Sequence, residues 1–190
     1  MLKLRIISIV VVTLMVFSCK KEINVENTND ASKTTELVKD DLFRVSFNLN
    51  VSKDDNMHLY YTLDGSINFT EENSVWMPVK GSEKDQDVIF ALPEGIIPSL
   101  LRIDFGYGKN ESQSPVKLNS FKLSYQDKNE VISGQDIFKY FTPFEGYTDV
   151  DPGSTLLKRH KKDQASGPIL YPQTLLSEKI NKVTSGASPE

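Results

Sequence analysis

The sequence predicts a mainly β protein, built as a single antiparallel β-sandwich with one or two short peripheral helices. Hydrophobic and polar residues alternate strictly along residues 42–51, which is typical of a strand with one buried face. Further short segments rich in β-branched and aromatic residues recur up to residue 125, separated by turn-forming Gly, Pro, Asn and Asp. No helical periodicity interrupts this series. Such spacing indicates two packed sheets rather than alternating strands and helices.

The predicted strands follow one another at short intervals. The first carries its hydrophobic side chains on one face: Phe43, Val45, Phe47, Leu49 and Val51. Residues 57–62 form the next, and Asp64-Gly65 behind it signals a tight turn. The later strands are expected at residues 74–79, 87–92, 100–105 and 116–125. In the last of these the hydrophobic phase slips by one residue, which predicts a β-bulge near Asn119-Ser120.

Helical signals come only after residue 132. Ser133, with Asp136 three residues later, begins a predicted short helix whose apolar face consists of Ile137, Phe138 and Phe141. A second, amphipathic helix is predicted over residues 173–183, where hydrophobic residues recur at helical spacing: Leu176, Ile180 and Val183. Both helices are expected to pack on the sandwich.

The segment between the two helices is predicted to be a loop. Residues 143–168 are rich in Pro, Gly and Lys and include the basic run 158–162. This run fits a solvated loop, with a role at anionic headgroups as the alternative. We therefore predict a sandwich domain at residues 42–145, a loop with a packing helix at residues 146–190, and disorder from residue 184 onward.

The chain begins with the parts of a secretory signal. Lys3 and Arg5 give a basic start, residues 6–17 are almost wholly apolar, and Cys19 follows closely. The apolar run is shorter than the roughly 20 residues that a helix needs to cross the hydrocarbon core. We expect residues 1–18 to be removed as a signal peptide.

Val16-Phe17-Ser18-Cys19 resembles the lipobox of bacterial lipoproteins, and the leader is similar to those of Bacteroidota lipoproteins. The resemblance implies acylation of Cys19 and attachment to a membrane of the bacterial cell envelope, with the outer membrane as the expected location. The alternative is an ordinary signal peptide that Cys19 merely follows. Cys19 is the only cysteine, so the chain forms no internal disulfide and has no other thiol for catalysis.

Charge argues against one class of partner. The leader holds two of the 22 Lys and Arg residues and none of the 26 Asp and Glu residues, so the rest of the chain is acidic. An acidic chain is not expected to bind nucleic acid. Residues 19–41 are too polar to be buried, and we expect them to form a flexible tether between the lipid and the sandwich.

Few residues suit catalysis or metal binding. His58 is expected to be an ordinary sheet residue, and His160 lies in a basic run with no carboxylate beside it in sequence. The segment from Asp149 lacks the final acidic ligand of a helix-loop-helix calcium site. The remaining candidate calcium ligands are Asp54, Asp55, Asp85 and Asp87. Because no phosphate loop, nucleophile elbow or selective carboxylate pair is present, we predict no enzymatic activity, no metal and no cofactor.

Ligand-binding residues are predicted on exposed strand faces. If Val75 and Met77 point inward, the only tryptophan, Trp76, faces outward and can stack on a sugar ring. In the opposite register Trp76 is a core residue, and this alternative is left open. The candidate ligand-binding residues are Tyr60, Trp76, Arg102, Asp104, Tyr107 and Asn119.

Two segments resemble known glycan-associated domains. Tyr-Tyr-Thr-Leu-Asp-Gly-Ser at residues 60–66 resembles a hairpin of small β-sandwich domains appended to bacterial hexosaminidases and other glycan-active enzymes. Residues 101–105 and 116–123 resemble the closing strands of jelly-roll modules in cell-surface polysaccharide proteins. These resemblances imply a jelly-roll-like sandwich that binds polysaccharide without catalysis. The alternative is an envelope structural or assembly protein that binds a protein partner.

Overall fold

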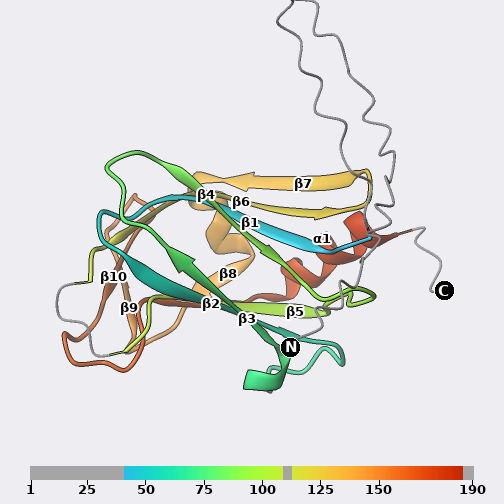
Figure 1. The fold of residues 1–190 in the computed structure, drawn as a ribbon, viewed down its shortest axis with the longest axis horizontal. Coiled ribbons are helices and arrows are strands. Elements are labelled where there is room, and N and C mark those ends of the chain that lie inside the picture. Colours follow the sequence, from blue (N-terminus) through green and yellow to red (C-terminus); the bar gives the residue numbers. More distant parts are fainter. Residues whose placement is uncertain (1–40, 109–112, 186–190) are drawn as a thin grey trace, which may run out of the picture. The chain divides into compact units, whose positions relative to one another are not determined.

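The computed structural model describes residues 41–108 and 113–185, and strands of this part of the chain form two antiparallel sheets (Figure 1). Sheet A has the order β4-β1-β6-β10-β9, with β7 also paired to β6, and sheet B has the order β3-β2-β5-β11-β8. The predicted antiparallel β-sandwich is thus confirmed. The predicted signal peptide, Cys19 and tether lie outside the described residues.

The strands of sheet A are β1 (Arg44–Asn50), β4 (Gln86–Ala91), β6 (Val116–Tyr125), β7 (Lys128–Ser133), β9 (Thr148–Val150) and β10 (Leu156–Arg159). Those of sheet B are β2 (Asp55–Thr62), β3 (Ser74–Val79), β5 (Leu100–Phe105), β8 (Phe141–Pro143) and β11 (Ile169–Pro172). Two 3₁₀ helices, η1 (Glu71–Asn73) and η2 (Gly134–Lys139), and one α-helix, α1 (Thr174–Thr184), complete the described elements.

The predicted bulge is present in the pairing of β1 with β6. Asn48 lies opposite Ser120, whereas Leu49 lies opposite Leu118, so Asn119 is the extra residue on β6. The slip keeps the hydrophobic side chains on both sides of the bulge on the core face. A strand without it would turn one half of its hydrophobic residues toward solvent.

The core lies between the two sheets. All five hydrophobic residues of the first strand and its flanks are at most 2% exposed: Phe43, Val45, Phe47, Leu49 and Val51. Phe47 meets Phe90 and Phe105 edge-to-face at centroid distances of 6.1 and 5.6 Å, a favoured aromatic geometry. The predicted helix is confirmed as α1, whose buried residues Leu176, Ile180 and Val183 join this core. Within the described ranges no helix has both the length and the apolarity to span a bilayer.

The chain after residue 143 differs from its prediction. Instead of one loop it contributes β9 and β10 to sheet A and β11 to sheet B. The buried side chains of these strands, such as Leu157 and Leu170, are too few and too widely separated by Lys, Pro and Gly to produce an alternating pattern. Residues 148–172 therefore supply strands to both sheets of the sandwich, and α1 packs on it.

The predicted helix after Ser133 is also different in detail. It is the 3₁₀ helix η2, and Phe141, which we assigned to its apolar face, begins β8 instead. Ile137 and Phe141 are nevertheless both buried in the core, as predicted.

Candidate functional site

Five of the six predicted ligand-binding residues lie together on the outer face of sheet B. Tyr60 stands on β2, Trp76 on β3, and Arg102 and Asp104 on β5, at positions that alternation and cross-strand pairing place on one face. Tyr107 follows β5. These five line a depression of about 180 Å³, which is completed by His58, Gly106, Ala165 and Ser166.

Trp76 is 43% exposed, so the outward register is the observed one and the core alternative is wrong. Val75 and Met77 are half-buried and pack against the core. The indole ring stacks on His58, with centroids 3.6 Å apart and planes 20° apart, and it meets Tyr107 edge-to-face at 4.9 Å. These neighbours hold Trp76 in one orientation, with part of the ring exposed to solvent.

His58 is buried beneath this aromatic layer, at 2% exposure. Its Nε2 atom has no hydrogen-bond partner among the described residues, and Oε2 of Glu71 lies 3.6 Å away. Burial lowers the pKa of His58 to about 4, although the Glu71 carboxylate opposes the effect. The imidazole is therefore neutral at pH 7 and serves as a flat support for Trp76.

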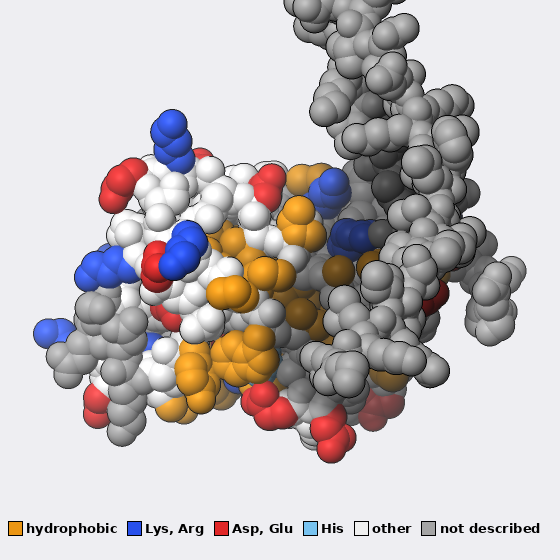
Figure 2. All heavy atoms as spheres, in the orientation of Figure 1, with side chains coloured by type: hydrophobic (Ala, Val, Ile, Leu, Met, Phe, Trp, Pro, Cys, Tyr) orange, Lys and Arg blue, Asp and Glu red, His pale blue; other side chains and the backbone are white. Residues whose placement is uncertain are grey.

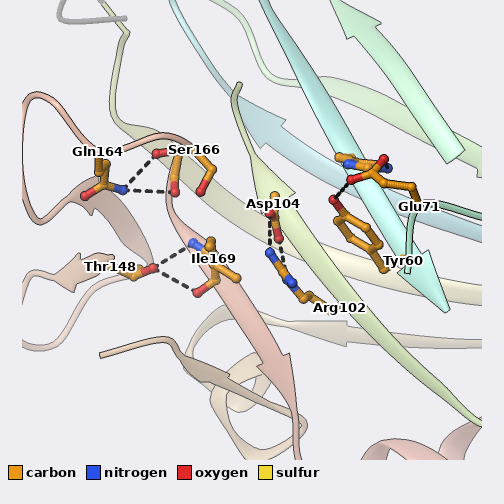
Figure 3. Close-up of polar contacts among 10 residues, drawn as sticks. Tyr60, Glu71, Arg102, Asp104, Thr148, Gln164, Ser166 and Ile169 are labelled. Carbon is orange, nitrogen blue, oxygen red and sulfur yellow. Dashed lines mark hydrogen bonds and ion pairs between the residues drawn. The ribbon is translucent and has the colours of Figure 1, made fainter. Parts of the chain in front are cut away.

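The polar centre of the depression is an ion pair on β5 (Figure 3). Arg102 donates from Nε to Oδ1 of Asp104 at 2.8 Å and from Nη2 to Oδ2 at 2.6 Å. Burial raises the pKa of the Asp104 carboxyl, against the effect of the guanidinium. Burial lowers the pKa of Arg102, but the hydrogen bonds to Asp104 and its negative charge outweigh this effect and raise the pKa. This bidentate pair fixes the orientation of both side chains.

Tyr60 connects the ion pair to the neighbouring 3₁₀ helix η1. Its hydroxyl donates to Oε1 of Glu71 at 2.7 Å (Figure 3), and burial together with this hydrogen bond raises the pKa of Tyr60. The guanidinium of Arg102 lies 4.7 Å from the Tyr60 ring centroid and 5.1 Å from that of Tyr171. Arg102 is thus held by two cation–π contacts as well as by Asp104.

Backbone contacts hold the rim beside Tyr107. Tyr107 forms an isolated β-bridge with Ser166, and Nε2 of Gln164 donates to the carbonyl oxygen of Ser166 at 2.9 Å. At Gly167 a Cβ atom would lie 1.9 Å from the carbonyl oxygen of Phe105. Only glycine permits this close approach, which brings the segment before β11 against the end of β5.

Asn119 lies apart from the other five predicted residues. It belongs to β6 of sheet A, and its Nδ2 atom donates to Oδ1 of Asn48 at 3.0 Å. Alternation along a strand shows which residues share a face, but it does not show to which sheet the strand belongs. On sequence alone, Asn119 was therefore grouped with residues of sheet B, although β6 belongs to sheet A. Its predicted role in the same groove is not supported.

Sequence reasoning missed several contributors to the site, among them Ala165 and Ser166 of the lining and also Glu71 and Tyr171, which contact Tyr60 and Arg102. Glu71 lies in a segment without periodicity between β2 and β3, so no pattern marked it. Tyr171 lies within β11, which we did not predict, although its neighbour Leu170 is fully buried and Tyr171 is not. A pattern of only two residues was too short to indicate a strand.

The basic run is not a simple solvated loop. Lys158 and Arg159 belong to β10, and Lys158 pairs with Asp151 at 2.8 Å. Arg159 is partly buried, donates to the carbonyl oxygens of Lys162 at 3.4 Å and Gln164 at 3.2 Å, and has its pKa lowered by burial. Arg159 therefore braces the segment that carries the rim of the depression.

His160 and Asp54, two of the remaining candidate residues, are engaged in structural contacts. Nδ1 of His160 lies 3.0 Å from Oδ1 of Asp149, a carboxylate that the fold brings near and that the sequence did not suggest. Asp54, one of the candidate calcium ligands, pairs with Lys80. Over residues 41–108 and 113–185, no group of three or more His, Cys, Asp and Glu side chains could hold a metal ion.

Comparison with known proteins finds no match among family models, curated proteins or solved structures. The functional interpretation therefore depends on the geometry of the outer face of sheet B.

Proposed function

We propose that the protein is a membrane-anchored lipoprotein of the bacterial cell envelope whose non-catalytic sandwich binds glycan on the outer face of sheet B. The observation that carries this proposal is the depression shared by Tyr60, Trp76, Arg102, Asp104 and Tyr107. Flat rings beside oriented polar groups offer both the stacking surface and the hydrogen bonds that a sugar ring needs. The lipid anchor is supported by the lipobox resemblance at Cys19.

Binding would combine stacking with hydrogen bonding. Trp76 is 43% and Tyr107 61% exposed, so both rings are accessible to the apolar face of a sugar. Asp104 is buried and orients Arg102, and the half-buried guanidinium of Arg102 can donate to sugar hydroxyl groups. A shallow site of this kind binds a single sugar weakly, and display of many copies on a membrane would raise the avidity for a polymer.

The test uses the mature chain with Cys19→Ser, which cannot be acylated, on a glycan array. Because Trp76 is the only tryptophan, its fluorescence reports directly on this site. We expect at least one polysaccharide to bind and to change the emission, and Trp76→Ala to lose binding. Val131→Ala, at a residue 56% exposed on β7 of sheet A, is the matched control and should bind normally. Failure of every polysaccharide to bind, with unchanged emission, would contradict the proposal.

A second candidate is an envelope assembly role, which is favoured by the edges of the two sheets. β3 is an edge strand of sheet B and β4 is an edge strand of sheet A, and the two strands contact each other. Figure 2 shows hydrophobic side chains gathered over the area where Figure 1 places these two strands. Ile89 on β4 is 48% exposed, and an edge strand offers unpaired backbone groups to a partner chain.

Cross-linking in intact cells separates the two candidates. If Ile89→Asp removes a cross-linked partner while glycan binding persists, the assembly role is supported. If the variant changes no cross-link, this second candidate fails.

A further inference from the structure

The aromatic surface of sheet B continues beyond the depression. Phe144, Tyr147 and Tyr171, the distal cluster, lie near β8 and β11 at the other end of the sheet. The ring centroids of Phe144 and Tyr171 are 4.7 Å apart and those of Phe144 and Tyr147 are 5.4 Å apart, with planes within 30° of parallel. Phe144 is 37% exposed, so the cluster presents a ring to solvent.

Side chains connect the distal cluster to the depression. Phe69 meets Tyr60 edge-to-face at 6.4 Å and Tyr171 at 5.8 Å. Arg102 lies over both Tyr60 and Tyr171. Rings and the guanidinium thus form one continuous row that crosses sheet B.

The order of strands gives the length of this row. From β3, which carries Trp76, to β8, which precedes Phe144, the sheet has four strand spacings. At about 4.8 Å each, the row is about 19 Å long. That span exceeds one sugar ring and fits several units of a chain lying across the strands.

The distribution of polar groups fits the same occupant. The Arg102–Asp104 pair lies between the two aromatic ends of the row. On the outer face of sheet A, by contrast, β1 presents only polar side chains: Arg44, Ser46, Asn48 and Asn50. The row of rings, exposed at Trp76 and Tyr107 at one end and at Phe144 at the other, therefore belongs to the face that carries the candidate site.

We propose that the distal cluster is a second subsite for the same glycan, so that the protein binds the interior of a linear polysaccharide rather than its terminal sugar. This inference rests on the glycan-binding function proposed above. Once one end of the row holds a chain, the other end meets the neighbouring units at a high effective concentration. A two-unit glycan spans only one end of the row, whereas a longer chain contacts both.

The experiment is titration calorimetry of the mature Cys19→Ser chain. The probes are linear β-1,4-linked glucose, mannose and xylose oligosaccharides of two and six units. We expect six units to bind more tightly than two. Phe144→Ala should weaken binding of the six-unit probe about two- to tenfold, the loss of one stacking contact, and leave two-unit binding unchanged. Phe144→Leu keeps the bulk without the flat ring and should behave like Phe144→Ala.

The control is Leu175→Ala, which removes a hydrophobic side chain that is 42% exposed on α1; it should bind like the parent chain. Equal affinity for two and six units, or unchanged six-unit binding by Phe144→Ala, overturns the second subsite and leaves the proposed function standing if Trp76→Ala still weakens binding. If no probe binds, the second subsite is overturned, and the proposed function falls with it only if every polysaccharide on the glycan array also fails to bind.

Discussion

Lowering the pH from 7 to 4.5 should destabilise the folded chain by about 2 kcal/mol through His58 alone. The pKa of His58 falls from 6.5 to about 4 on folding because the imidazole is buried. Folding therefore favours the neutral ring. The contribution of His58 to stability is fully present above pH 6.5 and is lost as the pH falls toward 4, since the unfolded chain takes up the proton first. At about 1.36 kcal/mol per pKa unit, the full effect is about 3 kcal/mol.

The assay is urea unfolding at pH 7 and at pH 4.5 for the parent chain and for His58→Phe, which keeps an aromatic ring under Trp76 but cannot be protonated. Relative to His58→Phe, the parent should lose about 2 kcal/mol between the two pH values. His160→Gln, at a histidine whose side chain is 44% exposed, is the matched control and should follow the parent. An equal pH dependence of the parent and His58→Phe, or an imidazole titration of His58 near pH 6.5 by NMR, would refute the reasoning.

Three further predictions concern other parts of the chain. Thr148 accepts a hydrogen bond from the Ile169 amide at 2.7 Å and donates to the Ile169 carbonyl at 2.8 Å. Thr148→Val should therefore lower the free energy of unfolding by about 1–3 kcal/mol in urea melts, and an unchanged value would show that these bonds are replaced. Asn119→Ala should cost about 1 kcal/mol or less and leave glycan binding on the array unchanged; weaker binding would return Asn119 to the site. Cys19→Ala should yield a folded chain that incorporates no labelled fatty acid and leaves the membrane fraction, whereas continued labelling would contradict acylation at Cys19.

The strands that could be predicted are those with several hydrophobic residues in alternation along the strand. The first strand and its flanks have five alternating hydrophobic residues, and β6 revealed even its bulge at Asn119 through a slip in that phase. Strands β9, β10 and β11 are three or four residues long and lie among Lys, Pro and Gly. They are stabilised by pairing with distant strands, and no local pattern reports such pairing.

The candidate site was predictable to the extent that neighbouring positions share a face. Tyr60, Arg102 and Asp104 were grouped correctly because β2 and β5 pair directly. The orientation of Trp76 was not decided by sequence, because both faces of this strand carry apolar residues: Val75, Met77 and Val79 on one, Trp76 and Pro78 on the other. Glu71 and Tyr171 reach the site through tertiary contacts that carry no periodic signal.

The late position of β10 and β11 has a consequence for how the chain folds. β10 pairs with β6, and β11 lies between β5 and β8. Asp104 on β5 therefore cannot pair on this side until Ile169 has been made. A chain that is delivered N-terminus first can complete neither sheet until its last strand has arrived. During that interval the edge of β5 and the start of β6, at Val116 and Lys117, are open, and pairing across such long sequence separations is slow. The segment from residue 146 onward thus acts as the closing step of folding, and a chain truncated there would leave two open sheet edges that can pair with other chains.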